Sequence, residues 1–201
     1  MSRPLELPPQ KKTLRREMVG RRDALTPAEL ADIAARLTGH LAALPEYRSA
    51  RSVLATMSIG TEWSTRAFIE RAKADGKDIV LPRVSAPPRH LELHRVADFE
   101  RDLVAGVWDI PEPDPARCPS VRFAEVDFAL VPALAADRDG FRLGYGAGFF
   151  DGLLAGRGKR PFCVTALPAV LLVEELPREP HDVAVDLVID ERGMVRNRAR
   201  R

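Results

Sequence analysis

The sequence predicts one α/β domain, in which a mostly parallel sheet lies between helices on both faces as three layers. The length of 201 residues suits a single domain. Short apolar runs that are typical of buried strands alternate along the chain with stretches of helical spacing. The proline-rich residues 106–120 are interpreted as a loop inside this domain and not as a linker between two domains. We therefore expect residues 11–195 to form the domain, between a flexible segment at 1–10 and a basic tail at 196–201.

Two helices are expected before the first strand. The basic stretch KKTLRREMVGRRDAL (11–25) is followed by TPAEL, in which Thr26 is the expected N-cap and Glu29 completes a capping box. Pro27 suits the first helical position, and apolar residues recur at helical spacing from Leu30 to Leu41. We expect the two helices to lie together across one face of the sheet.

The rest of the chain supplies the sheet. Apolar or alternating runs predict strands at 52–57, 77–84, 91–96, 126–134, 161–167 and 185–190. Helices are expected at 64–76 and within FFDGLLAGRG (149–158), where the second helix should end at the glycines.

Composition and charge restrict the class of protein. The chain is 45% apolar and 30% charged, and its net charge of +2 gives no strong reason to expect a nucleic-acid partner. The two cysteines do not have the spacing of a disulfide framework. No run reaches the ~20 apolar residues of a membrane span, and the first residues lack the apolar part of a signal peptide. We expect a cytoplasmic protein that binds neither nucleic acid nor membrane. An alternative is an RNA- or membrane-surface-binding protein that uses its basic ends.

The stretch GFRLGYGAGFFD (140–151) is the strongest candidate for a site. Glycines alternate there with aromatic residues, directly after an apolar strand whose carboxyl end would face a ligand in an open α/β sheet. Glycines let backbone N–H groups turn toward an anion, Arg142 adds a charge, and Asp151 offers a carboxylate to Mg²⁺. The pattern lacks the endings of the common phosphate-binding motifs, so a tight structural turn fits equally well on spacing alone.

RLGYGAGFFD, read together with other segments, resembles the signature of the 5-formyltetrahydrofolate cyclo-ligases, also called 5,10-methenyltetrahydrofolate synthetases. The other matching segments, in the family's order, are KKTLR (11–15), MSIGTEWST (57–65), LPR (81–83), VWDIPEP (107–113) and HDVAVD (181–186). The resemblance covers about residues 11–195. It implies a layered α/β fold and an enzyme, a ligase that forms a C–N bond.

The implied reaction uses ATP and Mg²⁺ to close 5-formyltetrahydrofolate to 5,10-methenyltetrahydrofolate, with release of ADP and phosphate. The expected partners are these small molecules, and the expected state is a monomer or weak dimer. A non-catalytic nucleotide- or folate-binding relative of the same fold is the alternative.

The resemblance also implies roles for individual residues. Arg142 and Asp151 are the expected catalytic residues, and Asp151 and Asp182 the expected metal ligands. Met57, Glu62, Trp108, Tyr145 and Phe149 are expected to contact folate, with Glu62 accepting hydrogen bonds from the N–H edge of the pterin. The residues expected to bind ATP are Lys11, Arg15, Arg142, Leu143, Gly144, Tyr145, Gly146, Ala147, Gly148, Phe149 and Phe150.

Several of these residues have plainer interpretations. Lys11 and Arg15 also fit a solvated helix face, Glu62 a helix N-terminus, Asp182 a turn, and Trp108 the core. The family usually has Tyr at the position of Phe149 and Gly or Lys at that of Ala147, so a hydroxyl contact to folate is missing here.

Overall fold

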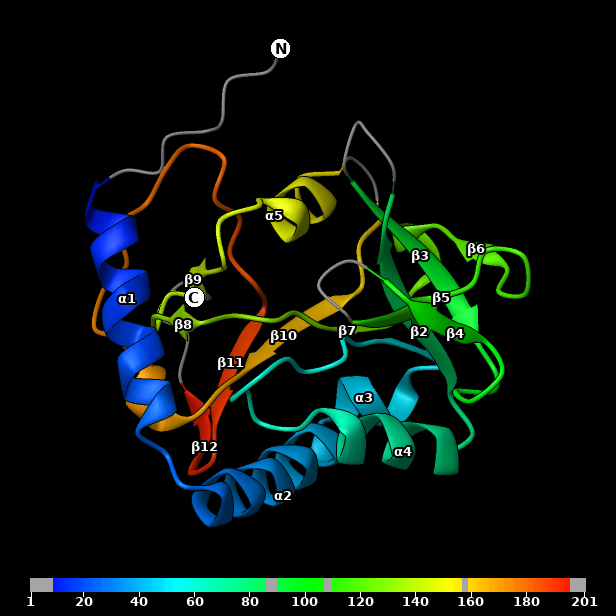
Figure 1. Cartoon of the computed structure of the whole chain (residues 1–201), viewed down its shortest axis with the longest axis horizontal. Coiled ribbons are helices and arrows are strands. Elements are labelled where there is room, and N and C mark those ends of the chain that lie inside the picture. Colours follow the sequence, from blue (N-terminus) through cyan, green and yellow to red (C-terminus); the bar gives the residue numbers. More distant parts are fainter. Residues whose placement is uncertain (1–8, 86–89, 107–109, 157–158, 196–201) are drawn as a thin grey trace.

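The computed structural model describes residues 9–85, 90–106, 110–156 and 159–195 (Figure 1). The central sheet has eight strands in the order β12-β11-β10-β7-β1-β2-β3-β6. Their bounds are β1 Ser52–Leu54, β2 Asp78–Val84, β3 Leu91–Val96, β6 Ser120–Val121, β7 Phe128–Leu130, β10 Phe162–Ala166, β11 Leu187–Asp190 and β12 Gly193–Val195. Two small antiparallel pairs lie beside the sheet: β4 Leu103–Ala105 with β5 Pro111–Pro113, and β8 Ala135–Ala136 with β9 Arg142–Leu143.

The sheet is mixed, with a parallel centre. The neighbours β11, β10, β7, β1 and β2 run parallel to one another. The pairs β2–β3, β3–β6 and β11–β12 are antiparallel, so the expected parallel sheet is confirmed only at its centre. Residues 91–96 form a strand with the predicted bounds, whereas several predicted strands are shorter. The run 52–57, for example, leaves the sheet after Leu54, so its last residues are free to line a cavity.

Helices cover both faces of the sheet (Figure 1). The helices α2 (Pro27–Ala43), α3 (Pro45–Ser49) and α4 (Arg66–Ala74) pack on one face, and α1 (Pro9–Asp23) and α5 (Phe149–Leu154) belong to the core of the other. The prediction that the first two helices share a face is therefore wrong. The reason is physical: a central parallel sheet buries both faces, and each face needs its own cover.

Local sequence signals explain where the helices begin. In α2 the backbone N–H of Thr26 donates to Oε2 of Glu29 at 2.8 Å and the N–H of Glu29 donates back to Oγ1 at 3.3 Å, so the predicted capping box is confirmed. Helix α1 begins at Pro9, so the last two residues of the segment expected to be flexible are helical. A proline fits there because its missing N–H would have had no partner in the first turn. The other expected flexible residues, 1–8, and the basic tail lie outside the described residues.

The described part of the stretch 106–120 contains strand residues and is not all loop. It contributes β5, which pairs with β4, and the first residue of β6, which pairs with β3. The prediction failed there because the prolines at 111 and 113 argue against a strand. Proline is tolerated in β5 because this short strand has only one strand neighbour within its sheet, so one of its edges needs no N–H donor. Among the described residues, no helix is long and apolar enough to cross a membrane.

An aromatic cluster fixes α3 and α4 to the sheet. Tyr47 lies 5.6 Å from Phe68 and 5.7 Å from Phe128, measured between ring centroids, and all three side chains are buried. The Tyr47 hydroxyl donates to Oδ2 of Asp75 at 2.9 Å, so burying this tyrosine leaves no unpaired polar group.

Replacing Phe128 with Ala removes the ring that joins this cluster to β7. We expect Phe128→Ala to lower the free energy of unfolding by about 3–5 kcal/mol, because a cavity remains where the ring was. Urea denaturation measures the loss, with Val170→Ala, at a 45% exposed position, as the control. A loss below about 1 kcal/mol would show that the cluster does not anchor the helices.

Candidate active site

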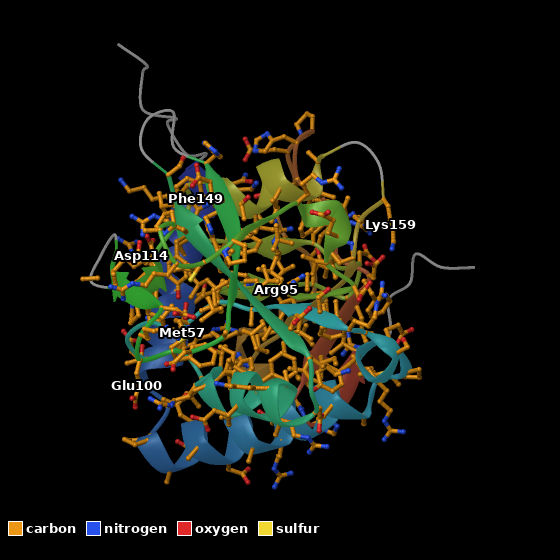
Figure 2. The ribbon with its side chains drawn as sticks, turned by 90° about the vertical axis from the view of Figure 1, so that its right-hand side faces the viewer. Met57, Arg95, Glu100, Asp114, Phe149 and Lys159 are labelled. Carbon is orange, nitrogen blue, oxygen red and sulfur yellow. The ribbon has the colours of Figure 1, made fainter. Side chains whose placement is uncertain are left out.

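A cavity of about 270 Å³ opens at the carboxyl ends of the parallel strands. Met57 follows β1, the end of β2 supplies Pro82 and Val84, and Pro132 follows β7. Helix α1, the glycine loop and residues 179–182 close the other side. Ligands gather at this edge in open α/β sheets because the chain leaves every parallel strand there in loops. In Figure 2, Phe149 lies above Met57 on one side of the ribbon, and both residues line the cavity.

The glycine loop, residues 144–148, connects β9 to α5. Gly146 has φ of 109° and Gly148 has φ of 70°, a region of backbone conformation that residues with a side chain rarely adopt. Gly148 is also the N-cap residue of α5, directly before the first helical residue, Phe149. The glycines are therefore required for the bend, and the whole loop lines the cavity.

Arg142 and Asp151 form an ion pair beside this loop. Nη2 of Arg142 donates to Oδ1 of Asp151 at 2.9 Å, and Nη1 donates to the carbonyl oxygen of Val183 at 2.7 Å. The Arg142 side chain is only 3% exposed, and this burial lowers its pKa from the ordinary value although Asp151 opposes the change. Arginine stays charged even so, because its ordinary pKa lies far above neutral pH. The pair holds the Asp151 carboxylate at the cavity wall.

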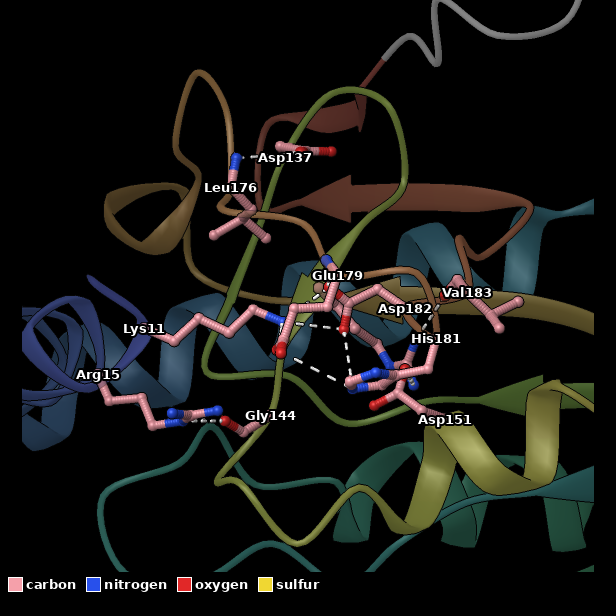
Figure 3. Close-up of polar contacts among 11 residues, drawn as sticks. Lys11, Arg15, Asp137, Gly144, Asp151, Leu176, Glu179, His181, Asp182 and Val183 are labelled. Atoms are coloured by element: carbon pink, nitrogen blue, oxygen red, sulfur yellow. Dashed lines mark hydrogen bonds and ion pairs between the residues drawn. The ribbon is translucent and has the colours of Figure 1, made fainter. Parts of the chain in front are cut away.

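Lys11 is bound by two acidic side chains across the cavity (Figure 3). Its Nζ lies 2.7 Å from Oε2 of Glu179 and 2.7 Å from Oδ2 of Asp182, and its side chain is 7% exposed. Burial alone would lower the pKa of Lys11, but hydrogen bonds to Asp182 and Glu179 outweigh it and raise the pKa. The alternative that Lys11 lies on a solvated helix face is therefore wrong. Asp182 is more than a turn residue, because its carboxylate pairs with Lys11.

Arg15 lies one helical turn further along α1. Its Nε donates to the carbonyl oxygen of Gly144 at 2.8 Å, so the side chain touches the glycine loop (Figure 3). Its Nη1 is buried and has no hydrogen-bond partner among the described residues. Buried donors are normally satisfied, and one that lines a cavity is therefore suited to a ligand acceptor.

Tyr145 connects the glycine loop to the segment that carries Glu62. Its hydroxyl donates to Oε1 of Glu62 at 2.5 Å and accepts from Nη1 of Arg22 at 2.6 Å. Oε2 of Glu62 accepts the backbone N–H of Ile59 at 2.9 Å. Burial raises the pKa of Tyr145, and the Glu62 carboxylate raises it further, so the hydroxyl stays protonated as a donor. Helix α4 begins at Arg66, so Glu62 is not at its N-terminus.

The structure brings most of the expected site residues into one cavity. The expected ATP-binding residues, the expected metal ligands Asp151 and Asp182, and the expected folate contacts Met57, Glu62, Tyr145 and Phe149 all line it. Trp108 lies outside the described residues, so its role stays a prediction.

The sequence reasoning missed two contributors to this site. Glu179, which pairs with Lys11, lies in a loop and had no pattern to mark it. Arg22 could have been found, because it follows Arg15 by seven residues and positions seven apart share a helix face.

Comparison with known proteins agrees with this geometry. A model of the "5-formyltetrahydrofolate cyclo-ligase family" matches residues 8–191. The 5-formyltetrahydrofolate cyclo-ligase of Mycolicibacterium smegmatis is 34% identical over 191 residues, covering 94% of this chain and 97% of that protein. The cyclo-ligase of Mus musculus is 26% identical over 90% of this chain and 93% of its own length.

A solved structure gives the same result for the fold. The NMR structure of 5,10-methenyltetrahydrofolate synthetase from Aquifex aeolicus matches with a TM-score of 0.83 and 28% identity, covering 95% of this chain and 94% of that one. Because a family model spans nearly the whole chain, and the segments that carry the sequence signature converge on one cavity, the chain belongs to the 5-formyltetrahydrofolate cyclo-ligase family.

Proposed function

We propose that the chain catalyses the ATP-dependent cyclisation of 5-formyltetrahydrofolate to 5,10-methenyltetrahydrofolate, with release of ADP and phosphate. The observation that carries the proposal is the cavity in which Arg15 offers, beside the glycine loop, a buried N–H group that no other described residue binds. Family membership and the names of the relatives support the same reaction. A cytoplasmic location and a monomeric or weakly dimeric state stay predictions.

The cavity divides into two chemically different parts. Lys11, Arg15 and the glycine loop supply cations and backbone groups suited to phosphate oxygens. Met57, Val84 and neighbouring apolar side chains supply a wall suited to the flat rings of a reduced folate. The proposal places the triphosphate at the first part and the folate at the second, so that the γ-phosphorus faces the formyl oxygen.

The charges at the phosphate end explain why a metal ion is needed. The three cations at this end, Lys11, Arg15 and Arg142, face an equal number of carboxylates, those of Glu179, Asp182 and Asp151. A triphosphate brought next to three carboxylates meets repulsion unless a further cation enters with it. Carboxylate and phosphate oxygens are the ligands that Mg²⁺ prefers, so the donor set fits this ion.

Asp151 and Asp182 would hold the magnesium ion, as the resemblance implies. Oxygens of Glu179 and Asp182 and a ring nitrogen of His181 also lie within 4.8 Å of one another, which leaves room for further ligands. When bound, the ion would neutralise the charge that develops on the phosphate oxygens.

The chemistry of ring closure requires positioning above all. A formamide oxygen leaves poorly, so the γ-phosphoryl group of ATP is first transferred to it and ADP departs. The N10 lone pair then attacks the activated formyl carbon, N10 loses its proton, and phosphate leaves with the formyl oxygen. Attack within one molecule can gain about 7–11 kcal/mol from proximity when the groups are held in line. The cavity walls would hold the folate in that folded shape and keep water from the activated carbon.

The reaction itself is the first test. The purified chain is expected to produce the near-ultraviolet absorbance of methenyltetrahydrofolate from 5-formyltetrahydrofolate only when ATP and Mg²⁺ are both present. Tight binding of both substrates without any product would contradict the proposal and favour a non-catalytic relative.

Asp151→Asn should lower turnover by about 10²–10³-fold, because it removes a charge from the site of phosphoryl transfer. The affinity for 5-formyltetrahydrofolate should change little, which calorimetry measures in the absence of nucleotide. Asp32→Asn, on the exposed side of α2, is the matched control. Unchanged turnover in Asp151→Asn would remove its proposed role.

Arg15→Ala should raise the KM for ATP by about 10- to 100-fold, since a charged hydrogen bond to phosphate contributes about 1.5–3 kcal/mol. Arg16→Ala changes the same charge at an exposed position of the same helix and serves as the control. Equal KM values for the two variants would show that the phosphates bind elsewhere.

A further inference from the structure

Glu112 is a buried carboxylate in the cavity wall for which the proposed reaction has so far no use. It lies in β5, is 4% exposed, and lines the same cavity as the glycine loop. A buried carboxylate is costly unless its charge and its hydrogen bonds are satisfied. Such a group at a ligand cavity therefore calls for a partner.

The described residues supply Glu112 with an incomplete set of partners. The backbone N–H of Val84 donates to Oε1 of Glu112 at 3.3 Å. Nη1 of Arg83 lies 3.8 Å from Oε2, too far for a hydrogen bond, and donates to the carbonyl oxygen of Pro113 at 3.0 Å. An ionised carboxylate has about four acceptor positions, so most of this capacity remains free among the described residues. Arg83 thus compensates part of the charge but leaves the acceptors of Oε2 unused.

The fold makes space for this carboxylate at one particular place. Gly106 follows β4 and lies so close that a Cβ built on it would collide with Cγ and Cδ of Glu112. The backbone of Gly106 does not have a positive φ, so flexibility does not explain the glycine. The absence of a side chain at 106 is what leaves space for the Glu112 carboxylate between Gly106 and the backbone N–H of Val84 in β2.

The surroundings of Glu112 are apolar. Val84, which bonds to it, pairs with Leu91 across β2 and β3, and Ile110 and Pro111 precede it in the chain. All four of these residues line the cavity. The cavity thus places apolar side chains beside the two carboxylate oxygens, a combination that suits a planar ring with two adjacent N–H donors.

Resting on the proposed function, we propose that Glu112 determines specificity by binding the aminopyrimidinone edge of the folate. The ring N3–H and the 2-amino group lie side by side on that edge and match the two oxygens of one carboxylate. A site built to accept hydrogen bonds strongly rejects an analogue that lacks the donor.

Glu62, expected from the sequence to accept from this edge, is less suited to it. Both of its oxygens are already engaged, one with the Tyr145 hydroxyl and one with the Ile59 N–H. We therefore assign the pyrimidine edge to Glu112, which accepts one hydrogen bond among the described residues where Glu62 accepts two.

The test uses Glu112→Gln in the full chain. Gln keeps the shape and one carbonyl oxygen for the Val84 N–H, but it replaces the second acceptor with a donor. The Kd and KM for 5-formyltetrahydrofolate should rise about 10- to 100-fold, while the Kd for ATP with Mg²⁺ stays within about twofold. Glu92→Gln, a half-exposed residue of the neighbouring strand, is the matched control. A Kd for the folate equal to that of the wild type would overturn the proposal.

A substrate analogue without the 2-amino group separates recognition from a merely structural effect. The wild type should bind this 2-desamino analogue about 10- to 100-fold more weakly than the natural substrate, and Glu112→Gln should bind the two about equally. If Glu112→Gln weakens both ligands by the same factor, Glu112 acts on the fold and not on the ring.

A second variant keeps the proposal testable if Glu112→Gln does not fold. Gly106→Ala pushes the Glu112 carboxylate aside without removing it and should also weaken folate binding selectively. The proposed function fails if the wild type makes no product, and the direct binding constants still test Glu112 in that case. If the wild type turns over and both variants bind the folate normally, only this inference fails.

Discussion

The buried pair of Arg142 and Asp151 is the interaction on which the site depends. Arg142 lies in β9 and Asp151 in α5. Arg142 also donates a hydrogen bond to the carbonyl oxygen of Val183, in the loop before β11, so the interaction joins three segments of the chain. With the side chain of Arg142 almost fully buried, the loss of the Asp151 carboxylate would leave that buried cation without its anionic partner, which typically costs about 3–5 kcal/mol. The glycine loop lies between two of these segments, so its shape follows from where the pair holds them.

Charge compensation is the second constraint. Across the cavity, Lys11 is held by Glu179 and Asp182 much as Arg142 is held by Asp151. Without a ligand, these groups neutralise one another, which makes their burial tolerable. With the proposed ligands, the same groups could exchange partners: lysine toward a phosphate oxygen, and carboxylates toward a metal ion. Arg15 differs, because its Nη1 has no partner to exchange among the described residues.

The sequence was a good guide wherever a pattern depends on neighbours in the chain. The capping box at Thr26 and the strand 91–96 are local signals, and both are confirmed. Strand direction is not a local signal, since an apolar run has the same appearance in a parallel and an antiparallel pair, so the antiparallel edges were not foreseen. The face covered by α1 was also missed, because it depends on how the whole chain closes around the sheet.

For the site, the resemblance to a family identified the cavity, and the residues that it missed explain the limits of such reasoning. The buried Lys11 has its charge compensated by Glu179 and Asp182, which are 168 and 171 residues away in the chain. Glu112 lies in a motif that the sequence did single out, but its significance depends on the space that Gly106 leaves and on the distance to Arg83. Both are facts of packing that one sequence does not contain.

The central claim is that the cations of the phosphate end are matched in number by carboxylates, so that nucleotide and metal ion enter together. Calorimetric titration of ATP into the wild-type chain, with Mg²⁺ and then with a chelator, measures this directly. The account predicts that binding weakens by at least about 10-fold when Mg²⁺ is removed. Equal affinity in the two titrations would contradict it, since the carboxylates would then not oppose the phosphates.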